Sequence, residues 1–86
     1  MTVTLRLFAA AREAAGRGHD EFATSDAPTV DALLAAATTA YGPTFGDVLA
    51  RSRVWVNGDE PADGRATRLA DGDEVAVLPP VSGGIA

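Results

Sequence analysis

The chain has 86 residues, of which 47% are hydrophobic, which suits one domain with a modest core and no deep substrate pocket. Its formal net charge of −5 and its seven scattered basic residues argue against nucleic acid binding and suit a partner with a basic face. The absence of cysteine excludes disulfides, thiolate metal sites and cysteine catalysis.

The first quarter of the chain predicts two strands around a short helical turn. Residues 2–8 alternate strictly between two faces, with Val3, Leu5 and Leu7 on one and Thr4, Arg6 and Phe8 on the other, which is typical of a half-buried strand. The alanine-rich residues 9–15 predict a short helical turn that ends at Gly16. Residues 19–25 then predict a second strand, with Phe22 as its main apolar anchor.

The clearest helix is predicted between Thr29 and the Gly42-Pro43 pair. Thr29 is a good N-cap, and Asp31 lies in the first turn, where the helix dipole favours an anion. Apolar side chains recur there at helical spacing and form one stripe: Val30, Leu33, Leu34, Ala37 and Tyr41. Residues 43–51 are expected to add a short helical turn.

The second half predicts a strand, a minor strand and a final strand. Residues 53–56 place two valines inward and Trp55 outward, and Asn57-Gly58 suits a tight hairpin turn. A short apolar segment at Leu69 is the minor strand. Residues 74–78 form the last strand, which Pro79-Pro80 end because proline donates no ladder hydrogen bond.

This order of elements predicts an α+β fold with one long helix on one face of a sheet. The regular aliphatic alternation of the first and last strands predicts that they lie at the centre of that sheet. The other face is expected to be open to solvent. The chain divides into a domain of residues 1–80 and a C-terminal arm of residues 81–86.

Side chains that could perform chemistry are few. His19 is the only histidine, lies beside Asp20 in an expected loop, and is interpreted as an ordinary exposed histidine. Asp71, Asp73 and Glu74 are too few and too irregularly spaced for a calcium loop and indicate a solvated turn. We therefore expect no active site, metal site or bound cofactor. The first residues also lack the features of a signal peptide, and no apolar run reaches the roughly 20 residues that span a bilayer, so we expect a cytoplasmic protein that binds no membrane.

Three large apolar side chains are expected on the open sheet face. Phe8, Trp55 and Leu78 all alternate away from the side that the helix covers. If they are contiguous they mark a partner interface, because apolar patches rimmed by polar groups mark interaction sites. The alternative is that they are ordinary exposed apolar residues.

The residues after the last strand are the other candidate site. The six residues 79–84 reach roughly 20 Å when extended, and Gly83 and Gly84 have the narrow cross-section that suits a tunnel in a partner. A carboxylate on such an arm can be delivered into the active site of another protein. The alternative is an inert, frayed end.

Three segments, in the right order, resemble a known family. Residues 69–84 (LADGDEVAVLPPVSGG) are similar to the C-terminal signature of MoaD-type small subunits of molybdopterin synthase. Residues 5–16 (LRLFAAAREAAG) and 28–37 (PTVDALLAAA) resemble the first strand and helix and the main helix of the same subunits. The resemblance spans residues 3–84 and implies a ubiquitin-like β-grasp sulfur carrier of the MoaD/ThiS family, with a mixed sheet of four to five strands.

The resemblance also implies a mechanism in which this chain is not catalytic by itself. An activating enzyme of the ubiquitin-activating type, which holds ATP and magnesium, adenylates the carboxylate of Gly84, and sulfur then replaces AMP to give a thiocarboxylate. The arm, including Val81, Ser82 and Gly83, inserts into the large subunit of molybdopterin synthase. There the sulfur passes to cyclic pyranopterin monophosphate. Phe8 and Leu78 would belong to the partner-facing patch.

The sequence departs from the family pattern after Gly84. Family members typically end at Gly-Gly, whereas here an amide joins Gly84 to Ile85, and an amide cannot be adenylated. We expect a peptidase to remove Ile85-Ala86. The alternatives are a carrier for thiamine, cysteine or secondary-metabolite synthesis, a modifier that forms isopeptide bonds, and a non-catalytic interaction module.

Overall fold

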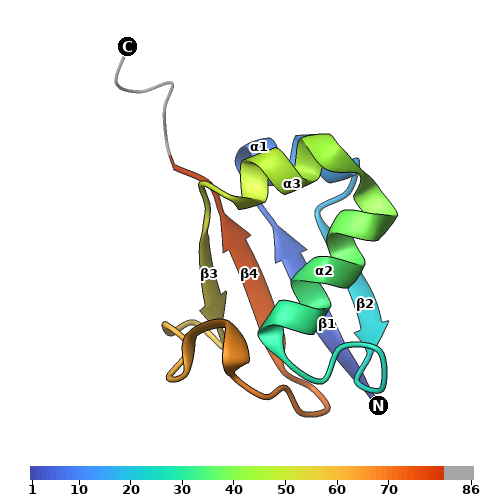
Figure 1. The fold of residues 1–86 in the computed structure, drawn as a ribbon, viewed down its shortest axis with the longest axis vertical. Helices are drawn as coiled ribbons and strands as arrows, with labels where there is room; N and C mark the ends of the chain where they lie inside the picture. Colours follow the sequence, from blue (N-terminus) through green and yellow to red (C-terminus); the bar gives the residue numbers. More distant parts are fainter. Residues whose placement is uncertain (81–86) are drawn as a thin grey trace.

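The computed structural model describes residues 1–80, which fold into one sheet with helices on one side and at one end (Figure 1). The elements in chain order are β1 (Thr2–Leu7), α1 (Ala9–Ala15), β2 (His19–Ala23), α2 (Val30–Tyr41), α3 (Pro43–Leu49), β3 (Arg53–Val56), a short 3-10 helix (Gly64–Ala66) and β4 (Glu74–Leu78). This is the predicted α+β order.

The sheet has the strand order β2-β1-β4-β3. β1 and β4 pair in parallel, with Leu5 opposite Val75, and each pairs with an edge strand in antiparallel fashion. The prediction that the first and last strands lie at the centre is therefore confirmed. Strands buried on one face and flanked on both sides need the regular aliphatic alternation that these two segments have.

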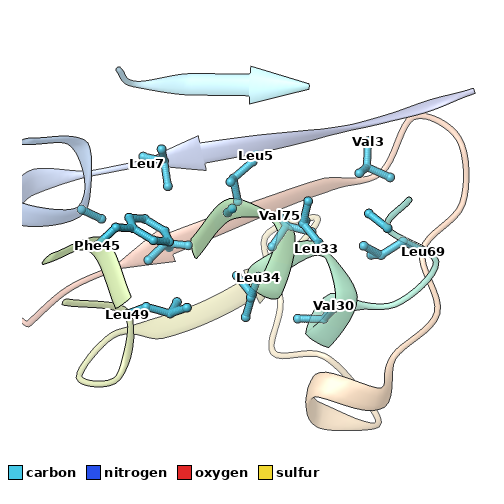
Figure 2. Close-up of a cluster of buried hydrophobic side chains, with 14 of the residues drawn as sticks. Val3, Leu5, Leu7, Val30, Leu33, Leu34, Phe45, Leu49, Leu69 and Val75 are labelled. Carbon is cyan, nitrogen blue, oxygen red and sulfur yellow. The ribbon is translucent and has the colours of Figure 1, made fainter. Parts of the chain in front are cut away.

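The core lies between the sheet and α2, which crosses one face of the sheet (Figures 1 and 2). Four residues of the predicted α2 stripe are buried and Tyr41 packs partly buried against them. Thr29 is the N-cap, as predicted, because its Oγ1 accepts a hydrogen bond from the backbone N–H of Ala32 at 3.1 Å. The inward residues of β1 and β4 complete the cluster: Val3, Leu5, Leu7, Val75 and Val77.

α3 contributes more to the core than the short turn expected from the sequence. It is a seven-residue helix whose Phe45 is fully buried. The Phe45 ring meets the Tyr41 ring edge to face, with 5.1 Å between ring centroids. Together α1 and α3 cover the end of the sheet at which β1 and β4 finish (Figure 1).

The predicted minor strand at Leu69 does not form. Leu69 is buried, but its backbone N–H donates to the carbonyl of Pro28 at 2.9 Å, and Arg68 makes only an isolated bridge to Thr29. This segment therefore makes its backbone contacts with the start of α2 and not with the sheet. Among residues 1–80 the sheet has four strands.

The predicted tight turn at Asn57-Gly58 is present, with both residues at positive φ (52° and 87°). Val56 and Asp59 exchange backbone hydrogen bonds of 2.8 and 3.1 Å across it. The chain does not continue as a strand after Asp59, however, and β3 pairs with β4 instead.

Candidate functional site: the open sheet face and the end of β4

The face of the sheet opposite α2 presents the alternate residues of all four strands. One row across it runs through Trp55, Ala76, Arg6 and His19, which are neighbours in the strand register. His19 is the first residue of β2, which agrees with the strand predicted over residues 19–25 and overturns the expectation of a loop at His19. The open face thus carries polar side chains and charges of both signs at its β1–β2 side, where Glu21 is opposite Thr4, and is more apolar toward β3.

Phe8 and Leu78 lie at the end of this face where the chain leaves the sheet. Leu7 pairs with Val77, so Phe8, the extended residue after β1, and Leu78, the last residue of β4, directly follow a pair of the parallel register. Phe8 is 40% exposed, and its ring lies 5.9 Å from the guanidinium carbon of Arg6. Leu78 is half-buried. These two residues can form the core of the predicted partner patch.

Ala9, directly after Phe8, has a positive φ of 49°, a conformation that costs a residue with a Cβ about 1–2 kcal/mol. The turn takes the chain from β1 into α1, and the carbonyl of Phe8 accepts hydrogen bonds from the N–H groups of Ala11 and Arg12. The backbone is therefore strained at Ala9, directly after the exposed Phe8.

Trp55 lies on β3, at the edge of the sheet. It projects to the open face, as predicted, but is half-buried, and it lines a hollow of about 290 Å³ at the β3 edge together with Pro61 and Arg65. Ala76 of β4 lies between Trp55 and Arg6 of β1 in the strand register. In the register of β3 and β4, Trp55 pairs with Ala76 and is the diagonal neighbour of Leu78. The grouping of Phe8, Trp55 and Leu78 as one partner patch stays a prediction.

β4 leads directly to the candidate arm. Pro79 and Pro80 end the strand and lie against Ala10 of α1 and Val48 of α3, around a small hollow of about 130 Å³ that Arg51 also lines. The last described residues of the chain therefore lie beside α1 and α3. The proposed reactive residue Gly84, its neighbours Val81, Ser82 and Gly83, and Ile85-Ala86 lie outside the described residues.

Basic residues that are scattered in the sequence meet in a shallow hollow at the β1–β2 side of the same face. It has a volume of about 550 Å³, and its lining includes Arg6, Phe8, Arg12, Gly18 and His19. The Arg12 side chain crosses over Gly18: a Cβ built on that glycine would lie 3.4 Å from the Arg12 Nε. Sequence reasoning missed this grouping because its members come from three different elements.

The carboxylates of Asp71, Asp73 and Glu74 make hydrogen bonds or an ion pair within the fold. Asp71 Oδ1 accepts from the backbone N–H of Thr2 at 2.8 Å, and Asp73 accepts from the Ala70 N–H at 2.8 Å and from Asn57 Nδ2 at 3.1 Å. Glu74 lies 3.4 Å from Arg6. These contacts fix the turn before β4 against β1 and β3. Within residues 1–80, no three acidic or histidine side chains gather as metal ligands would.

A second polar cluster joins α2 to the edge strand β2. The Tyr41 hydroxyl donates to Asp20 Oδ2 at 2.7 Å, and Arg17 lies 3.2 Å from the same oxygen. Burial would raise the pKa of Asp20, but the hydrogen bonds from Tyr41 and the Glu21 N–H and the charge of Arg17 outweigh it and lower that pKa. Burial and the Asp20 carboxylate raise the pKa of Tyr41. This cluster stabilises the fold and lies apart from the end of β4.

None of the helices in the described part of the chain combines the length and apolar character that a bilayer span requires.

Comparison with known proteins gives matches over nearly the whole chain. A model of the ThiS family matches residues 5–84. Small archaeal modifier protein 3 of Haloferax volcanii is 37% identical, over 98% of this chain and 100% of that protein. The molybdopterin synthase sulfur carrier subunit of Chlamydomonas reinhardtii is 36% identical, over 98% of this chain and 100% of that subunit.

Two solved structures have the same architecture. The crystal structure of SAMP1 from Haloferax volcanii has a TM-score of 0.81 and 30% identity, and the match covers 98% of this chain and all of that one. In the protein–protein complex of subunits 1 and 2 of the molybdopterin-converting factor from Helicobacter pylori, the matching chain has a TM-score of 0.70 and 25% identity over 98% of this chain and all of that one. The chain therefore belongs to the ThiS family and is a ubiquitin-like sulfur carrier or modifier protein with the β-grasp fold.

Proposed function

We propose that this chain is the sulfur-carrier subunit of a molybdopterin synthase and that Gly84 carries the sulfur as a thiocarboxylate. The observation that carries this proposal is the way β4 ends, together with the extent of the family match. β4, a central strand, ends at Leu78 and leads into Pro79-Pro80 beside α1 and α3, and the ThiS family match extends to Gly84.

The likeness to a molybdopterin synthase sulfur carrier subunit and to a chain of a molybdopterin-converting factor complex supports this branch of the family. By analogy with that complex, the proposed partner is a large subunit that covers the Phe8 and Leu78 end of the open face. Docking there would place residues 81–84 at the entrance of the partner's active site. No cofactor on this chain is required, because ATP and magnesium belong to the activating enzyme.

The proposed chemistry needs a free carboxylate at Gly84. A peptidase would hydrolyse the bond between Gly84 and Ile85. An oxygen of the new carboxylate would then attack the α-phosphorus of ATP, releasing pyrophosphate, and a sulfur nucleophile would displace AMP from the acyl adenylate. Adenylation is required because a free carboxylate is a poor electrophile and AMP is a good leaving group.

The test is to incubate the chain ending at Gly84 with the ubiquitin-activating-type enzyme of the same organism, ATP, magnesium and a sulfur donor. Intact mass spectrometry should show replacement of one oxygen by sulfur, and the product should convert cyclic pyranopterin monophosphate when the large subunit is added. The chain of residues 1–86 is the matched control and should gain no sulfur. A Gly84 terminus that forms no thiocarboxylate would refute the proposal.

The second candidate is a protein modifier, and the likeness to two small archaeal modifier proteins favours it. A modifier would use the same activated Gly84 to form an isopeptide bond with a lysine of a target protein. An epitope-tagged chain expressed in its own organism separates the two functions. High-mass conjugates that disappear in a Gly84→Ala variant would support the modifier, and loss of molybdopterin without conjugates would support the carrier.

A further inference from the structure

We infer that the hollow lined by Arg6, Phe8, Arg12 and His19 binds an acidic segment of the large subunit that docks on the open face. This inference rests on the proposed function and adds the chemistry of the contact. It reverses the expectation from composition that an acidic chain binds through an acidic surface.

The local charge of the hollow is opposite to the charge of the chain. The sequence contains twelve acidic and seven basic residues, yet the lining of the hollow includes two arginines and a histidine and no carboxylate. Arg6 forms an ion pair with Glu74, with 3.4 Å between the guanidinium nitrogen and the carboxylate oxygen. Within residues 1–80, Arg12 has no carboxylate at ion-pair distance. A carboxylate that enters the hollow therefore gains an arginine that is not already paired.

The fold holds these groups in place from three elements. Arg6 and His19 are opposite each other on the paired strands β1 and β2, and Arg12 reaches them from α1 across Gly18. The exposed Phe8 ring lies beside Arg6 at the rim nearest Leu78. The basic hollow is thus continuous with the apolar pair that the proposed function assigns to the partner.

An acidic protein segment fits this combination better than a nucleic acid or a small molecule. Guanidinium groups bind carboxylates through paired, charge-assisted hydrogen bonds, and the Phe8 ring offers apolar contact to a neighbouring side chain. A long polyanion would meet the surrounding negative charge of the chain. The hollow is also too shallow to enclose a small ligand, because it lies open on a sheet face.

The test uses the full chain of 86 residues and the large subunit from the same organism, purified from a bacterial host and shown by mass spectrometry to carry no phosphate. Carboxylates are then the side-chain anions available to the arginines. Isothermal titration calorimetry measures Kd for the unaltered chain, Arg12→Glu, Gly18→Leu and the control Arg68→Glu. Arg68→Glu makes the same charge change at an exposed position beside Thr29, remote from the hollow. Circular dichroism confirms that each variant is folded.

Arg12→Glu should weaken binding about tenfold or more, and raising the salt concentration should weaken the unaltered chain more than this variant. Gly18→Leu keeps the charge but displaces the Arg12 side chain, whose Nε lies 3.4 Å from the position of a Cβ on Gly18, and should weaken binding by a similar factor. Arg68→Glu should change Kd by less than about twofold.

Equal affinities of the unaltered chain, Arg12→Glu and Gly18→Leu would overturn the inference and leave the proposed function intact, because thiocarboxylate formation is measured separately. Equal weakening by Arg12→Glu and Arg68→Glu would also overturn it, since this would indicate a general charge effect. Failure of the unaltered chain to bind the large subunit would overturn both this inference and the proposed function.

Discussion

The hydrogen bond between Tyr41 and Asp20 should stabilise the fold by an amount that decreases at both low and high pH. The substitution is Tyr41→Phe, which removes only the hydroxyl. The ring should keep its edge-to-face contact with Phe45, so the loss reports the hydrogen bond and not the packing.

The expected cost at neutral pH is about 1 kcal/mol. A hydrogen bond to a charged group contributes roughly 1.5–3 kcal/mol. A value somewhat below this range applies here because Asp20 is half-buried and keeps two other partners, Arg17 and the Glu21 N–H. For a domain of this size, 1 kcal/mol lowers the melting temperature by about 4–8 °C.

The pH dependence follows from the direction of each pKa shift. The pKa of Asp20 is lowered in the folded chain, so its contribution is present above its unfolded pKa of about 3.9 and is lost as the pH falls further. The pKa of Tyr41 is raised, so its contribution is present below its unfolded pKa of about 10 and is lost as the pH rises further. The difference in stability between the two proteins should therefore be largest between these limits and shrink outside them.

Urea unfolding at a series of pH values measures the free energy of unfolding of both proteins. The chain contains a single tyrosine, so the ultraviolet absorbance of the phenolate directly titrates Tyr41. In the folded chain this titration should occur well above the usual range and should fall to it in urea. A folded-state titration near 10, or a stability difference that does not vary with pH, would refute the reasoning.

Three further predictions concern the core, the strained turn and the carrier residue. Leu34 of α2 is 1% exposed, and Leu34→Ala should lower the free energy of unfolding by about 2–5 kcal/mol in urea titrations. Thr39 is exposed, so the control Thr39→Ala should change it little. Equal effects of the two substitutions would contradict the packing described. Ala9→Gly should leave the free energy of unfolding unchanged or raise it by about 0.5 kcal/mol, because φ is positive at Ala9. Ala10→Gly should lower it by about 1 kcal/mol. Thermal unfolding that finds the same loss for both variants would argue against strain at Ala9. Gly84→Ala should leave the melting temperature unchanged and slow sulfur transfer to the pterin precursor, measured with the preformed thiocarboxylate; transfer at the normal rate would show that a narrow terminus is not required.

Most of the secondary structure follows from local patterns in the sequence. The alternation in residues 2–8 and 74–78 predicts strands because successive side chains of a strand point to opposite faces. The stripe of α2 and the cap at Thr29 predict that helix and the face it buries. The sequence predicts only a short turn for α3, because the burial of this helix depends on the contact of Phe45 with Tyr41 across a helix junction and not on a long periodic segment.

The exposed face shows where local patterns stop being sufficient. Alternation correctly indicates that Phe8, Trp55 and Leu78 point away from α2, but it carries no information on which of them are neighbours. The register between β1 and β4, which are separated by almost the whole chain, brings Phe8 and Leu78 to the same end of the sheet, and the register between β3 and β4 makes Trp55 the diagonal neighbour of Leu78.

The sequence by itself determined the α+β class, the central strands, the main helix and the family, because each is encoded by nearby residues or by motifs in order. The tertiary structure alone decided which distant side chains meet. It brought Arg6, Arg12 and His19 together in an otherwise acidic chain, paired Tyr41 with Asp20, and placed the end of β4 beside Phe8. The physical reason is that periodicity fixes the direction of a side chain within its own element, whereas strand pairing and helix packing fix its neighbours.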